Sequence, residues 1–83
     1  MKLNILYFSW VRERVGHSQE TFETDAATVE DLVMELFERD EGYAAAFRDM
    51  SAICVAVDQE LGEMTTYLKG SSEVAFFPPM TGG

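Results

Sequence analysis

The amino-acid sequence predicts one α+β domain, in which a mixed β-sheet carries one main helix packed on one face. Strand-forming runs stand near both ends of the chain, and one clearly amphipathic segment lies between them. The 83 residues suffice for one domain but not for two, and the 47% hydrophobic content allows a core without disulfides. The expected order is strand, strand, helix, strand, weak strand, strand.

The first expected strand spans residues 2–9, where strand-forming side chains alternate. Both of its faces are apolar, so we expect one face to meet the core and the other to meet something else. One face carries Leu3, Ile5 and Tyr7, and the other carries Leu6 and Phe8.

Two short elements are expected next. Residues 10–15 are compatible with a helical turn closed by Gly16, and residues 19–24 form a weaker alternating segment. We expect this segment to pair with the first strand as a hairpin.

The main helix is the clearest element in the sequence. Thr28 is a suitable N-cap, and Asp31 three residues later completes a capping-box pattern. We expect Gly42 to end this helix and residues 43–47 to add another short turn. The predicted apolar stripe comprises Val29, Leu32, Val33, Leu36 and Phe37.

The remaining elements are strands. Residues 53–57 are almost wholly apolar, which is typical of a central strand, and Asp58 and Gln59 mark the turn after it. Pro78 and Pro79 end the last strand because proline cannot donate a ladder hydrogen bond. The other expected elements are a short ragged strand near residues 61–67, a loop at residues 69–72 and the last strand at residues 73–77.

Charge and hydrophobicity disfavour two classes of partner. The formal net charge of -9 repels phosphate backbones and anionic lipid, so we expect no nucleic-acid partner and no membrane partner. No stretch approaches the roughly 20 apolar residues of a membrane span, and the start of the chain lacks a signal-peptide pattern. We therefore expect a cytoplasmic protein. The charge suits a protein partner with a basic face, or simply keeps the domain soluble.

The chain lacks the parts for independent catalysis. His17 is the only histidine and lies in an expected turn, whereas Cys54 is the only cysteine and lies in an apolar strand. No phosphate-binding loop, dinucleotide fingerprint or paired-cysteine metal motif is present. The acidic residues are interpreted as solvated faces, and no metal site is expected.

The last residues carry the most informative pattern. We expect residues 1–77 to form the domain and residues 78–83 an extended tail that ends in Gly82 and Gly83. Proline stiffens the start of such a tail, and glycine, lacking Cβ, passes through narrow channels. Activated as an acyl-adenylate, the carboxylate of Gly83 becomes an electrophile that sulfur can capture.

These features resemble the sulfur-carrier family to which the small subunit of molybdopterin synthase, or molybdopterin-converting factor, belongs. The most specific similarity is the F-F-P-P-x-T-G-G ending at residues 76–83. Residues 6–16 resemble the family's first strand and R-E-x-x-G turn, residues 28–32 its helix start, and residues 55–59 its central strand and turn.

The resemblance implies a β-grasp (ubiquitin-like) fold and a function. Gly83 would be adenylated by an ATP-using enzyme related to ubiquitin-activating enzymes, and a sulfurtransferase would convert it to a thiocarboxylate. The tail, with Met80, Thr81 and Gly82, would then enter the large subunit and donate sulfur to cyclic pyranopterin monophosphate. This forms the molybdopterin dithiolene in a heterotetramer whose catalytic residues lie on the large subunit. The chain itself would bind no cofactor.

The resemblance also implies a partner interface. It comprises Phe8, Arg12, Leu61, Phe77, Pro78 and Pro79. The alternative for the two phenylalanines is that a loop of the same chain covers them. Three other functions stay open: a thiamine-pathway sulfur carrier, a ubiquitin-like protein modifier, and a β-grasp binding module with an idle tail.

Overall fold

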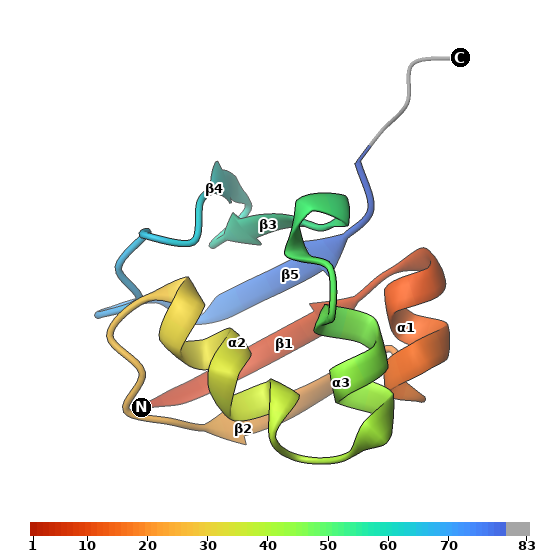
Figure 1. The fold of residues 1–83 in the computed structure, drawn as a ribbon. Coiled ribbons are helices and arrows are strands. Elements are labelled where there is room, and N and C mark those ends of the chain that lie inside the picture. The colour runs from red at the N-terminus through yellow and green to blue at the C-terminus, as the bar shows by residue number, and fades with distance from the viewer. Residues whose placement is uncertain (80–83) are drawn as a thin grey trace.

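A computed structural model describes residues 1–79 of the chain. Five strands, three α-helices and one 3-10 helix follow one another in this part (Figure 1). They are β1 (Lys2–Tyr7), α1 (Ser9–Val15), β2 (Gln19–Glu23), α2 (Val29–Phe37), α3 (Glu41–Phe47), η1 (Met50–Ala52), β3 (Cys54–Val57), β4 (Glu60–Gly62) and β5 (Glu73–Phe77).

The five strands form one mixed sheet in the order β2-β1-β5-β3-β4. β1 pairs with β5 in parallel, and the other three pairings are antiparallel. The last strand therefore lies in the middle of the sheet, between the first strand and β3. The predicted α+β class and mixed sheet are confirmed.

The helices cover one face of this sheet and enclose the core (Figure 1). Tyr7 and Phe76 stack at the centre with ring centroids 6.2 Å apart, and both side chains are buried. α2 buries four residues of its predicted stripe, but Phe37 is 43% exposed, because it is the last residue of the helix. No helix within residues 1–79 is long and apolar enough to cross a bilayer.

The first strand is shorter than predicted. It ends at Tyr7, and Ser9, with a φ of 52°, turns the chain into α1. The predicted turn at residues 10–15 is a helix that ends at Gly16, whose φ of 103° suits glycine. The N–H of Gly16 donates to the carbonyl oxygen of Arg12 at 2.8 Å.

The start of the main helix is as predicted, but its end is not. The N–H of Asp31 donates to Thr28 Oγ1 at 3.3 Å, which caps α2. The prediction that Gly42 ends this helix is wrong, because α2 ends at Phe37 and Gly42 lies in the first turn of α3. A Cβ on Gly42 would lie 2.6 Å from the carbonyl oxygen of Arg14, so glycine lets α3 approach α1 closely.

The turn between β3 and β4 forms at the predicted residues. Asp58 and Gln59 have φ values of 50° and 71°, which indicates a two-residue hairpin turn of the kind that matches strand twist. The predicted ragged strand at 61–67 is reduced to β4, and beyond it only an isolated bridge joins Thr28 to Tyr67.

Candidate functional site

The sheet face opposite the helices carries a continuous apolar row. Strand register places Leu6 beside Ala75, Ala75 beside Ala56, and Ala56 beside Leu61, so the row crosses four strands. Leu61 at its outer end is 81% exposed. A large apolar side chain this exposed is available to a partner.

Two phenylalanines extend the row toward the end of β5. Phe77 pairs with Cys54, and Phe8 directly follows β1, where its N–H donates to the carbonyl oxygen of Phe76 at 3.1 Å. Phe8 is 46% exposed and Phe77 is half-buried. We call this surface the open-face patch. It comprises Leu6, Phe8, Cys54, Ala56, Leu61, Ala75 and Phe77.

The alternation predicted for the first and last strands is confirmed. Tyr7 and Phe76 lie in the core, so Phe8 and Phe77 project from the other face. The alternative that a loop of the same chain covers the phenylalanines is wrong for Phe8, which stays exposed in the structure of residues 1–79.

Polar residues border the patch toward the start of β5. Asn4 lies between Thr21 on β2 and Glu73 on β5. The apolar surface is therefore confined to the half of the sheet nearest the point where the chain leaves β5.

The other predicted interface residues lie around that point. Arg12 is exposed on α1, one turn after Phe8, to whose carbonyl oxygen its N–H donates at 3.4 Å. Pro78 is half-buried and Pro79 is exposed. The predicted tail residues Met80, Thr81, Gly82 and Gly83 lie outside the described residues.

His17 and Cys54 lie on opposite sides of the sheet and do not form a pair. His17 Nε2 lies 3.1 Å from Glu20 Oε2 and 3.0 Å from the Tyr43 hydroxyl, on the helix-covered side. Cys54 is half-buried in the open-face patch on the other side of the sheet. Within residues 1–79, no three or more His, Cys, Asp or Glu side chains come together in a way that could hold a metal ion.

Glu20 lies in a polar cluster and is not on a solvated face as predicted for the acidic residues. Glu20 sits beside Ile5 on the core side of β2. The hydroxyls of Tyr7 and Tyr43 donate to Glu20 Oε2 at 2.7 and 2.6 Å, and Arg39 Nη1 donates to Oε1 at 2.7 Å. These bonds join α3 and the end of α2 to the sheet. The signal was available, because Glu20 shares a strand face with the apolar Phe22, and inward-facing acids need partners.

The protonation of this cluster follows from its contacts. Burial acts to raise the pKa of Glu20, but hydrogen bonds from Arg39, Tyr43, His17 and Tyr7 outweigh it and lower the pKa to about 2. Burial and the nearby Glu20 carboxylate raise the pKa of both tyrosines. Glu20 is thus ionised and the tyrosines are neutral donors at neutral pH, which is typical of a structural cluster.

Comparison with known proteins gives a consistent family match. The sequence pattern of the ThiS family matches residues 5–83. A Haemophilus influenzae protein named molybdopterin synthase sulfur carrier subunit is 36% identical over 81 residues, covering 98% of this chain and 99% of the relative.

Two solved structures share the ubiquitin-like β-grasp fold. Subunit 1 in the Helicobacter pylori complex of subunits 1 and 2 of molybdopterin-converting factor matches with a TM-score of 0.67 at 20% identity, covering all of both chains. The small archaeal modifier protein 1 of Methanosarcina acetivorans matches with a TM-score of 0.72 at 20% identity, covering 99% of this chain and 96% of that protein. At this identity the likeness shows the fold alone, so it does not separate carriers from modifiers.

Proposed function

This chain belongs to the ThiS family, and from this membership we propose that it is the sulfur carrier subunit of a molybdopterin synthase. The observation that carries the proposal is the near full-length similarity to a protein of that name. The same observation favours this function over a thiamine-pathway carrier and over a protein modifier.

The proposed reaction takes place at the carboxylate of Gly83. Its oxygen attacks the α-phosphate of ATP on an adenylating enzyme, and pyrophosphate leaves. A persulfide sulfur of a sulfurtransferase then displaces AMP from the adenylate, and a second thiol cleaves the resulting acyl disulfide, so that a thiocarboxylate and a protein disulfide remain. The thiocarboxylate sulfur bonds to cyclic pyranopterin monophosphate as a thioester, and water hydrolyses that thioester, which leaves the sulfur on the substrate and restores the carboxylate. Forming one dithiolene requires two such deliveries.

The composition of the tail supports its insertion into a channel of the large subunit. Residues 79–83 can extend about 17 Å at roughly 3.4 Å per residue. Two terminal glycines let the end pass walls that would obstruct a side chain. Met80, Thr81 and Gly82 would occupy that channel, and Pro78 and Pro79 would direct the tail away from β5.

The open-face patch is the proposed docking surface for the large subunit. It is apolar, partly exposed and adjacent to the point where the tail begins. Phe8, Leu61 and Phe77 supply its large side chains, and Arg12 borders it. Such a patch would be covered in the heterotetramer that we propose as the active form.

No cofactor is assigned to this chain under the proposal. ATP would be consumed by the adenylating enzyme, and the catalytic residues would lie on the large subunit. The ATP requirement fits a cytoplasmic location.

Mass spectrometry of the C-terminal peptide tests the proposal. After co-expression with the adenylating enzyme and the sulfurtransferase, we expect a thiol-reactive label on the peptide that ends at Gly83. A variant without Gly83 should fold, bind the large subunit and carry no label. Isopeptide-linked conjugates without labelled peptide would favour a modifier instead.

A further inference from the structure

Basic side chains gather at one corner of this acidic molecule. The whole chain has six lysines and arginines against fifteen acidic residues. Three of the six lie at neighbouring positions, because Arg12 and Arg14 are on α1 and Arg48 directly follows α3, which packs against α1. Half of the basic residues of this acidic chain therefore lie at one corner.

A hollow of about 660 Å³ opens at this corner between α1, α3 and η1. Its lining combines cationic groups with an apolar floor: the Trp10 ring is half-buried, and alanines leave room beside it. We call it the arginine hollow. It is lined by Trp10, Arg14, Ala45, Ala46, Arg48, Asp49 and Ala52.

The two arginines of the hollow have unused hydrogen-bond donors. The Arg14 guanidinium lies 4.5 Å from the centroid of the Trp10 ring, and its Nη1 donates a long bond, 3.4 Å, to the Ala45 carbonyl oxygen. Within residues 1–79, no carboxylate lies within 4.0 Å of a side-chain nitrogen of Arg14 or Arg48. By contrast, Arg39 is paired with Glu20.

The single acid of the hollow is already engaged. Asp49 Oδ1 accepts hydrogen bonds from the N–H and the hydroxyl of Ser51 at 3.1 and 2.5 Å, which caps η1. Asp49 therefore stays directed at its own helix and leaves the guanidiniums to an external anion.

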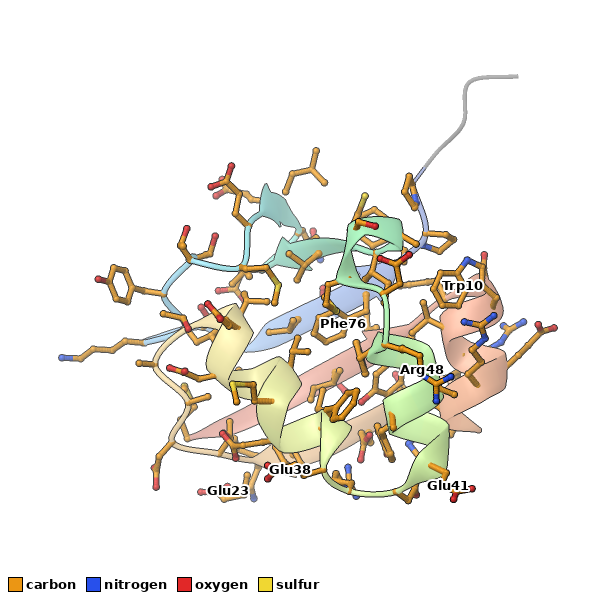
Figure 2. The ribbon with its side chains drawn as sticks, in the orientation of Figure 1. Trp10, Glu23, Glu38, Glu41, Arg48 and Phe76 are labelled. Atoms are coloured by element: carbon orange, nitrogen blue, oxygen red, sulfur yellow. The ribbon has the colours of Figure 1, made fainter. Side chains whose placement is uncertain are left out.

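Short stretches of chain join the arginine hollow to the open-face patch. α1 begins directly after Phe8, and η1 leads into Cys54, which pairs with Phe77. Figure 2 shows Trp10 and Arg48 on the side of the molecule where the chain leaves β5. A protein that covers the patch and extends around this end of the molecule would reach the hollow.

We propose that the arginine hollow binds an acidic segment of the protein that receives the tail. Carboxylates of that segment pair with Arg14 and Arg48, because guanidinium donors match carboxylate oxygens in a planar fork. An apolar side chain beside them packs on Trp10 and the alanine floor, which a bare phosphate would leave uncovered. The inference rests on the proposed function for the identity of this partner.

Trp10 is the only tryptophan, so its fluorescence reports on the hollow directly. The probe is a capped pentapeptide of four glutamates around one phenylalanine, added to the full chain at low salt. We expect a saturable change in emission. The double variant R14Q/R48Q should weaken binding about tenfold, and the difference should vanish near 1 M salt, where charges are screened within about 3 Å. The control K2Q/K69Q removes the same charge elsewhere and should bind as the original chain does.

Several results would overturn the inference. These are no saturable change, equal binding by R14Q/R48Q, equal binding of a glutamine version of the peptide, or displacement of the peptide by stoichiometric inorganic phosphate or ATP. Thermal melting of each variant checks that it is folded.

Calorimetry with the large subunit separates the two proposals. If R14Q/R48Q binds it about tenfold more weakly than the original chain, the inference is supported, and equal affinity counts against it. If the original chain does not bind the large subunit at all, the proposed function fails, while the peptide titration still decides whether the hollow takes acidic segments.

Discussion

Replacing Glu20 by Gln tests whether the polar cluster fixes α3 on the sheet. The hydrogen bonds lower the pKa of Glu20 from an ordinary 4.5 to about 2 despite its partial burial. One pKa unit corresponds to about 1.4 kcal/mol, so the ionised carboxylate contributes up to about 3 kcal/mol to the free energy of unfolding. Because 15% of the side chain faces solvent, which screens the charge, we expect E20Q to lose about 2 kcal/mol.

The pH dependence of this loss has a definite sign. A carboxylate whose pKa is lowered by folding stabilises the protein above its unfolded pKa and loses that contribution as the pH falls toward its folded pKa. The stability difference between the original chain and E20Q is therefore complete at neutral pH. It should shrink between pH 4.5 and about 2.

Thermal unfolding followed by circular dichroism measures this difference. At neutral pH we expect the Tm of E20Q to be about 10 °C lower, since 1 kcal/mol corresponds to about 4–8 °C in a domain of this size. The matched control is E38Q, because the Glu38 side chain makes no hydrogen bond or ion pair with any residue of 1–79. An unchanged Tm in E20Q, or a difference that stays constant into acid, would refute the reasoning.

Three further outcomes are expected. Deleting Gly83 should abolish sulfur transfer in a reconstituted synthase assay while leaving the melting curve unchanged, and retained transfer would contradict the proposed function. Leu61→Ser should weaken binding of the large subunit at least tenfold and change the free energy of unfolding by less than about 0.5 kcal/mol. The control is Tyr67→Ser, because Tyr67 is similarly exposed but lies outside the patch, and this variant should bind the large subunit as the original chain does. Gly42→Ala should lower the free energy of unfolding in urea by about 1–3 kcal/mol because its Cβ meets the Arg14 backbone. Gly62→Ala should lower it less, because its Cβ would meet side-chain atoms, Thr66 Oγ1 at 3.1 Å and Val57 Cγ2 at 3.5 Å.

Local side-chain patterns account for most of the fold that could be predicted. The last strand was placed at its observed bounds because alternation on one side and prolines on the other define it. The start of α2 was also correct, since Thr28 has the side chain that a helix N-cap needs. Where a residue's own chemistry decides the structure, the sequence is sufficient.

The predictions that are wrong concern residues whose role depends on contact between segments distant in the sequence. Gly42 was interpreted as a helix stop, but its role is to let α3 approach Arg14 on α1. Glu20 was interpreted as solvated, but Tyr7 and Tyr43 come from other elements to hold it. The arginine hollow likewise needs α1 and the end of α3 to meet, and no local pattern indicates that meeting.

The position of β5 between β1 and β3 links assembly of the domain to recognition. β5 is the last of the five strands in the chain. Until it is made, β1 and β3 lack the strand that lies between them, so the sheet cannot form as a whole. That same strand contributes Ala75 and Phe77 to the open-face patch. A chain interrupted before β5 would therefore lack both the middle strand of the sheet and part of the proposed docking surface, so it would neither fold fully nor dock.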